Sequence, residues 1–144
     1  MVKRILFICK HNLFRSRIAE ELFNKYNKNE NYKATSAGII KWDKKDLRGD
    51  AGFEAEKIVA SGRGINLKVK SKGLSSSLLK KMDLAVIVAD DVSRKIFRDK
   101  SFSGRTLAWK IPDVKEKDKN KEEVARKTIE YIDRKIKNLV RNLK

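Results

Sequence analysis

The stretch that decides the fold is residues 5–16, ILFICKHNLFRS, in which an apolar run leads into the only cysteine of the chain. Residues 5–8 are apolar without polar alternation, which is typical of a parallel strand covered on both faces. Apolar residues then recur at three- and four-residue spacing from Ile18 to Tyr26, which predicts an amphipathic helix. Cys9 and Arg15 are therefore predicted to lie in a short loop between a buried strand and a helix.

This loop has the residues that a phosphate cradle requires. The first N–H groups of a helix are unpaired and carry partial positive charge, so a chain that turns here can donate to phosphate oxygens. The same field favours the thiolate form of Cys9, which is the nucleophilic form. Arg15 would close the ring with a planar fork of donors that matches two phosphoryl oxygens. The alternative is a buried cysteine that only fills space at the end of a strand.

The other loop residues have supporting roles in this interpretation. Asn12 is expected to enter the left-handed region and to tie the loop down through its side chain. Ser16 can cap the helix or donate to the cysteine sulfur when it leaves as a thiolate. His11 is expected at the rim of the site rather than as a general base. Phosphate binding is also assigned to the remaining loop residues, Lys10, His11, Leu13 and Phe14.

The rest of the chain alternates predicted strands and helices. Further strands are expected at residues 32–36, 84–88 and 106–111. Helices are expected at residues 48–61, 76–81 and 91–98, and a last helix carries an apolar stripe from residue 124 to 143. This order predicts one α/β domain, residues 1–144, with three layers: a four-stranded parallel sheet and helices on both faces. Ligands bind at the carboxyl ends of such strands, where Cys9 falls.

Residues 5–20 resemble the N-terminal signature of the low-molecular-weight protein tyrosine phosphatases, a family that also includes thioredoxin-coupled arsenate reductases. Segments 36–38 (Ser-Ala-Gly), 78–91 and 111–113 (Ile-Pro-Asp) are similar to later elements of the family, in the same order. The resemblance implies a phosphotyrosine phosphatase I-like fold and a cysteinyl-phosphate intermediate. It also implies that neither a metal nor an organic cofactor is needed.

The resemblance also implies two further site residues. Asp113 matches the general acid, which protonates the leaving group and then activates water. By spacing alone Asp113 could equally be a solvated surface residue, with Asp118 as a rival acid. Trp42 falls where the family places an aromatic at the rim of the active site. Lys115 stands where the family has a tyrosine that flanks an aromatic substrate.

The predicted function is hydrolysis of phosphate monoesters by a protein tyrosine phosphatase, with a phosphorylated protein or a small phosphate ester as substrate. One alternative is an arsenate reductase without an internal cysteine relay. Arsenate reductases of this fold pass a disulfide through further cysteines, and this chain has no cysteine besides Cys9. The other alternative is a basic nucleic-acid-binding module on the same fold.

The net charge of +17 favours acidic partners. Such a charge attracts phosphorylated substrates and predicts nonspecific, salt-sensitive binding to nucleic acid. Adaptation to heat is the alternative cause of so many lysines. No apolar run approaches the ~20 residues that span a bilayer, and one free thiol without a disulfide framework indicates a reducing compartment. A cytoplasmic protein without a membrane partner is expected.

Overall fold

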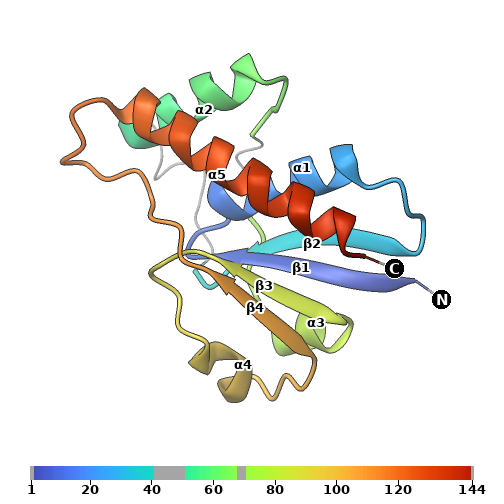
Figure 1. Ribbon diagram of the computed structural model, residues 1–144. Coiled ribbons are helices and arrows are strands. Elements are labelled where there is room, and N and C mark those ends of the chain that lie inside the picture. The colour runs from blue at the N-terminus through green and yellow to red at the C-terminus, as the bar shows by residue number, and fades with distance from the viewer. Residues whose placement is uncertain (1, 41–50, 68–70, 144) are drawn as a thin grey trace.

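The computed structural model describes residues 2–40, 51–67 and 71–143. In this part of the chain, four parallel strands form one sheet in the order β2-β1-β3-β4 (Figure 1). The strands are β1 (Lys3–Cys9), β2 (Tyr32–Gly38), β3 (Leu84–Val88) and β4 (Arg105–Trp109). The predicted α/β fold with a four-stranded parallel sheet is confirmed.

The apolar run at residues 5–8 forms the central part of β1, between β2 and β3. Each of these four residues is at most 1% exposed, because helices cover both faces of the sheet. Side chains alternate between the two faces of a strand, so Phe7 joins one hydrophobic core and Ile8 joins the other. The register pairs Cys9 with Gly38, which brings the cysteine to the carboxyl edge of the sheet.

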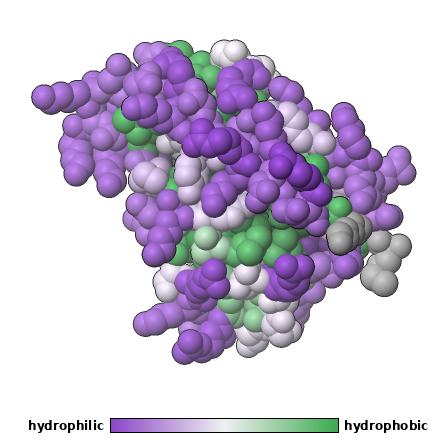
Figure 2. Space-filling model, in the orientation of Figure 1, coloured by the Kyte–Doolittle hydropathy of each residue, from purple (hydrophilic) through white to green (hydrophobic). Residues whose placement is uncertain are grey.

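The two helical layers differ in size. Helices α1 (Arg15–Tyr26), α2 (Ala51–Gly62) and α5 (Lys121–Arg141) cover one face (Figure 1). The other face carries α3 (Ser76–Lys80) and α4 (Lys95–Asp99), which are short. Hydrophilic residues cover most of the surface that α5 turns outward (Figure 2). Among the helices described, none combines the length and the apolar character that a membrane span requires.

The larger core forms where the stripe of α5 meets α1 and α2. Ile129, Ile132 and Ile136 are fully buried there, which confirms the amphipathic pattern of the last helix. Phe7 lies at its centre, with its ring 6.0 Å from that of Phe23 and 6.1 Å from that of Trp109. Burying one such side chain contributes about 1.5–3 kcal/mol.

A polar network joins the carboxyl ends of α1 and α2 to the middle of α5. Tyr26 on α1 donates its hydroxyl to Asp133 on α5. Arg63, directly after α2, and Lys137 on α5 form ion pairs with the same carboxylate, at 3.3 and 2.9 Å. Through Asp133, the position of α2 is therefore tied to α1 and α5.

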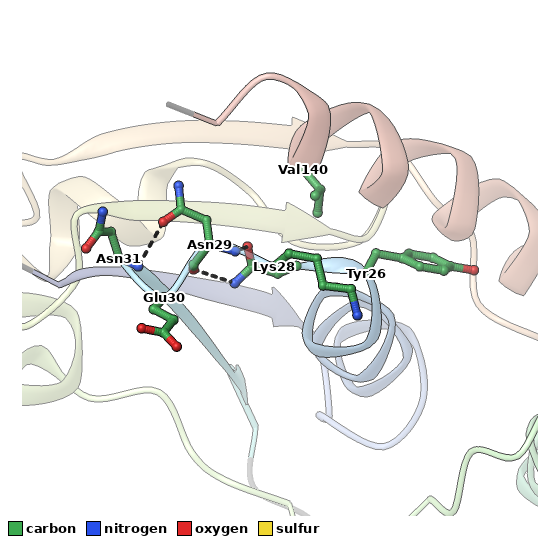
Figure 3. A pocket seen from close by; sticks show the side chains of 7 residues that line it. Tyr26, Lys28, Asn29, Glu30, Asn31 and Val140 are labelled. Atoms are coloured by element: carbon green, nitrogen blue, oxygen red, sulfur yellow. Dashed lines mark hydrogen bonds between the residues drawn. The ribbon is translucent and has the colours of Figure 1, made fainter.

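The turn between α1 and β2 is held by asparagine side chains (Figure 3). Asn29 N–H donates to Asn27 Oδ1 at 3.0 Å, and Asn31 N–H donates to Asn29 Oδ1 at 2.9 Å. Asparagine favours such turns because its side chain can replace a backbone partner. An open polar hollow at this turn lies at the opposite end of β2 from Gly38.

Some predicted boundaries are wrong. The helix expected at 91–98 begins only at Lys95, because Asp90 and Asp91 turn toward Arg15 instead of opening a helix. The last strand is Arg105–Trp109 rather than 106–111, although Asp90 N–H still donates to Ile111 O at 3.0 Å. Residues 48–50, the first three of the helix expected at 48–61, lie outside the described residues.

Gly38 is placed where no side chain fits. A Cβ atom at this position would lie 2.6 Å from the backbone carbon of His11 and 2.7 Å from the backbone nitrogen of Asn12. The backbone of Gly38 is fixed on its other side, where its N–H donates to Lys72 O and its C=O accepts from Leu74 N–H, both at 2.8 Å. The loop after β1 therefore packs directly on the end of β2.

We expect Gly38→Ala to lower the free energy of unfolding by about 1–3 kcal/mol, because neither backbone can move away from the added methyl group. Gly62→Ala is the matched control, since its Cβ would meet nothing within 4 Å. At such a position alanine is neutral or stabilises by up to about 1 kcal/mol. Urea unfolding of both variants measures the difference. Equal midpoints would show that the loop can retreat from β2.

Candidate active site

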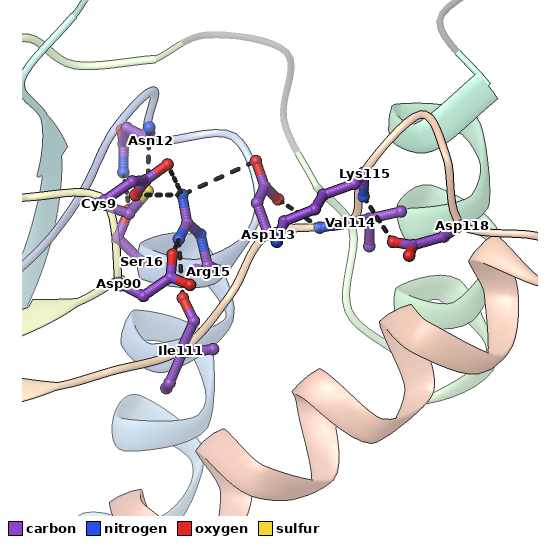
Figure 4. A network of polar contacts seen from close by, with 11 residues as sticks. Cys9, Asn12, Arg15, Ser16, Asp90, Ile111, Asp113, Val114, Lys115 and Asp118 are labelled. Atoms are coloured by element: carbon purple, nitrogen blue, oxygen red, sulfur yellow. Dashed lines mark hydrogen bonds and ion pairs between the residues drawn. The ribbon is translucent and has the colours of Figure 1, made fainter.

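The loop that follows β1 surrounds the sulfur of Cys9 (Figure 4). Cys9 is 2% exposed. Asn12 N–H donates to its Sγ at 3.2 Å, and Ser16 Oγ lies 3.0 Å from the same sulfur. Helix α1 begins at Arg15, so the loop ends at a helix N-terminus. Donors directed at one atom in this way stabilise negative charge on it.

Asn12 holds the loop in shape. Its φ is 56°, which confirms the predicted left-handed conformation. Its Nδ2 donates to Ser16 Oγ at 2.8 Å and to Ser36 Oγ at 2.9 Å, and its Oδ1 accepts from Lys72 N–H at 2.9 Å. Ser36 in turn donates its hydroxyl to Glu20. The side chain thus connects the loop to α1, to β2 and to the segment before α3.

Arg15 is buried and surrounded by acceptors. It is 2% exposed, and its Nη1 donates to Ile111 O at 2.8 Å. Its Nη2 lies 3.1 Å from Asp91 and 3.7 Å from Asp113, and its Nη1 lies 3.7 Å from Asp90. A buried guanidinium needs such partners, because an unpaired charge away from water is costly.

Asp90 and Asp91 were not predicted as site residues. They follow β3 after one residue, Ala89, so they lie at the same carboxyl edge of the sheet as Cys9. Polar residues that follow neighbouring parallel strands meet at one edge, and this signal was present in the sequence.

A small cavity of about 40 Å³ brings several predicted site residues together. It is lined by Cys9, His11, Leu13, Phe14, Arg15 and Asp113, and by Glu56, which was not predicted. Lys10 lies beside them in the loop and is partly exposed. Trp42 lies outside the described residues. The rival acid Asp118 is not part of the cavity, since it accepts from Lys115 N–H at 2.7 Å on the far side of Asp113 (Figure 4).

Loop side chains differ in where they lie. Phe14 is 3% exposed and packs in the larger core, so it anchors the loop. His11 is among the residues that line the cavity. Burial lowers the pKa of His11, and the positive charge of Lys10 lowers it further. His11 is therefore largely uncharged at neutral pH, in a position at the mouth of the cysteine site.

Glu56 reaches the site from the middle of α2. It is 6% exposed, and its carboxyl group forms a hydrogen bond with that of Asp113. Burial raises the pKa of Glu56 well above its ordinary range, and the negative charge of Asp113 raises it further. The sequence held a signal here, because Glu56 lies between Phe53 and Ala60 on the buried stripe of the helix.

No metal site accompanies these groups. Among the residues that the structure describes, no three His, Cys, Asp or Glu side chains are arranged to hold a metal ion. The polar groups of the cavity instead suit an oxyanion: the guanidinium of Arg15 and a backbone N–H that donates to the sulfur of Cys9, with carboxyl groups at one side.

The fold and the site define a class of α/β proteins in which a strand–loop–helix cradle holds an oxyanion beside a cysteine. Within this class, the chain belongs to the low molecular weight phosphotyrosine protein phosphatase family, whose model matches residues 4–144. No curated protein sequence matches the chain.

Solved structures agree with this assignment. An arsenate reductase from Archaeoglobus fulgidus is 30% identical, with a TM-score of 0.71 over 96% of this chain and 99% of that chain. A low molecular weight protein tyrosine phosphatase from T. tengcongensis is 23% identical, with a TM-score of 0.69 over 98% and 99%. An arginine phosphatase from Geobacillus stearothermophilus is 18% identical, with a TM-score of 0.67 over 96% and 91%. The last two support the fold alone.

We expect Asn12→Ala to destabilise the protein more than Asn12→Gly does. Both variants lose the three side-chain hydrogen bonds, but only alanine is strained at a φ of 56°, by about 1–2 kcal/mol. Urea unfolding of the two variants measures the difference. Ser101→Gly is the control, because Ser101 has the same φ on the exposed surface. Equal midpoints for the two Asn12 variants would contradict a strained loop.

Proposed function

We propose that this protein hydrolyses phosphate monoesters through a cysteinyl-phosphate intermediate, with Cys9 as the nucleophile. The observation that carries the proposal is the surroundings of the sulfur: a backbone N–H at 3.2 Å and a hydroxyl oxygen at 3.0 Å, at the start of a helix. Both can stabilise a thiolate, which attacks phosphorus without a separate base. Membership of the phosphatase family supports the same chemistry.

In the first step, the loop amides and Arg15 bind the phosphoryl oxygens. We assign the amides to the residues between Cys9 and Ser16, namely Lys10, His11, Asn12, Leu13, Phe14 and Arg15. The Cys9 sulfur forms a bond to phosphorus while the bond to the leaving oxygen breaks. Asp113 gives its proton to that oxygen, and Arg15 stabilises the charge on the equatorial oxygens.

In the second step, water replaces the cysteine on phosphorus. Asp113, now ionised, accepts a proton from the attacking water. The sulfur leaves as a thiolate, and Ser16 Oγ at 3.0 Å is placed to donate to it. Phosphate then leaves the loop. The ion pair of Asp113 with Arg15, at 3.7 Å, supports a position beside the bound phosphoryl group.

A phosphotyrosyl protein is the proposed substrate, on the basis of the family. The net charge of +17 would draw such an anion toward the protein. The exposed Lys115 stands where an aromatic substrate would otherwise meet a tyrosine, so small phosphate esters and other phosphorylated residues belong to the same proposal.

Arsenate reduction is the second candidate, because the relative that is 30% identical is an arsenate reductase. Arsenate is a tetrahedral oxyanion that the same loop would accept. Its reduction to arsenite requires two electrons from thiols, and the chain has no cysteine besides Cys9. The reductant would therefore be an external thiol.

Hydrolysis of p-nitrophenyl phosphate across mildly acidic to neutral pH, with a chelator present, tests the proposal. We expect the wild type to turn over and Cys9→Ser to lose at least about 1000-fold in kcat, because a serine hydroxyl is not ionised here. Inorganic phosphate should still bind to Cys9→Ser, as measured by calorimetry.

The second candidate is tested by supplying the protein with arsenate, with dithiothreitol as the only thiol, and measuring the release of arsenite. Release of arsenite without ester hydrolysis would replace the phosphatase by a reductase. Normal hydrolysis by Cys9→Ser would show that another residue is the nucleophile.

We expect Asp113→Asn to slow phenyl phosphate more than p-nitrophenyl phosphate, because the poorer leaving group depends on protonation. A loss of about 100-fold or more in kcat/KM is expected for phenyl phosphate. Asp118→Asn is the matched control, since Asp118 lies outside the cavity. If both substrates lost activity equally and slightly in Asp113→Asn, the acid would be another group.

A further inference from the structure

The proposed mechanism does not use Glu56, although this residue lines the same cavity as Cys9 and Asp113. A carboxyl group in the middle of a helix is normally solvated, whereas Glu56 is 6% exposed. Helix α2 thus directs an ionisable side chain into the site. A buried polar group that is retained at such a position needs a partner, and the partner here is Asp113.

The surroundings of Glu56 come from several elements. Among the described residues, the ionisable groups that act on its carboxyl group include Asp113 from the segment after β4, Arg15 from α1 and Cys9 from β1. His11, whose pKa is lowered by burial and by Lys10, lines the same cavity. The other charged residues of the same part of α2, Glu54 and Lys57, form an ion pair with each other at 3.0 Å on the exposed side. Neither of them pairs with Glu56, which lines the cavity together with Asp113.

Two carboxyl groups in hydrogen-bond contact hold one proton between them. Two negative charges at this distance repel, and a hydrogen bond between them needs one donor. Such a pair titrates as a unit and keeps its first proton to higher pH than an isolated carboxyl group does. Because Glu56 is the more deeply buried of the two, the proton is mainly on Glu56.

We propose that Glu56 and Asp113 share one proton, and that Glu56 is a positioning residue that keeps Asp113 supplied with this proton toward neutral pH. This inference rests on the proposed phosphatase activity. Glu56 acts through Asp113 and does not itself contact the phosphoryl group. The pair would extend the pH range in which the leaving group is protonated.

The proton balance of the pair follows the two chemical steps. Before attack the pair holds one proton. As the leaving oxygen departs it takes the proton from Asp113, which receives it from Glu56, so both carboxyl groups are then ionised. The attacking water returns one proton to Asp113, and the pair is restored. Arg15, within 4 Å of Asp113, compensates the second negative charge in between.

The pH profile of kcat/KM for phenyl phosphate tests this role. We expect Glu56→Gln to move the alkaline limb by about 1–2 pH units to lower pH, because Asp113 alone binds a proton less tightly than the pair. Glutamine keeps the shape of the side chain and a hydrogen-bond donor, so a merely structural role predicts an unmoved limb. Glu54→Gln, two residues earlier on the exposed side of α2, is the matched control. Superimposable profiles for the two variants would overturn the proposal.

A titration that needs no turnover separates this proposal from the phosphatase itself. We expect the carboxyl carbon of Glu56, followed by NMR, to titrate at higher pH than that of Glu54, and to fall toward it in Asp113→Asn. If Glu56 titrates with Glu54 in the wild type, the shared proton is refuted. If the wild type hydrolyses no ester, the phosphatase proposal fails, and the carboxyl titration alone decides whether the pair exists.

Discussion

A fully buried asparagine is the interaction on which the site depends. Asn12 is 0% exposed, and its amide is satisfied only because Ser16, Ser36 and Lys72 present matching groups. An unsatisfied buried amide would cost about 1–3 kcal/mol, so these partners have to stay in place. They belong to α1, β2 and the segment before α3. The loop around Cys9 is therefore rigid because the adjoining helix α1 and two distant parts of the chain hold one side chain.

The sequence predicted the parts of this structure that local patterns encode. The apolar runs at 5–8 and 84–88 became central strands, and the order of residues from Cys9 to Ser16 gave the loop. Glu56 was not predicted, although its spacing from Phe53 and Ala60 places it on the buried stripe of α2. That spacing does not say which residue the carboxyl group meets, because Asp113 lies far away in the chain. Nor did the sequence reveal the start of α4, where pairing of Asp90 and Asp91 with Arg15 overrides helix formation. These misses come from contacts between residues far apart in the chain.

Charge is distributed unevenly between the surface and the site. The protein as a whole carries +17, whereas the buried Arg15 faces Asp90, Asp91 and Asp113. The basic surface acts at long range, since it raises the concentration of anions near the protein. The carboxylates act at short range and compensate the guanidinium while no anion is bound. A phosphoryl group entering the loop therefore competes with these carboxylates for the same donors.

The burial of Glu56 also has a thermodynamic consequence for the whole fold. Its pKa is raised in the folded protein, whereas the unfolded chain releases this proton near the ordinary value of 4.5. The folded state then binds more protons than the unfolded state, so the free energy of unfolding falls as the pH rises above 4.5, until Glu56 itself ionises. The stabilising contribution of the protonated Glu56 is fully present only below pH 4.5. The protein thus gives up some conformational stability near neutral pH to keep a proton inside its cavity.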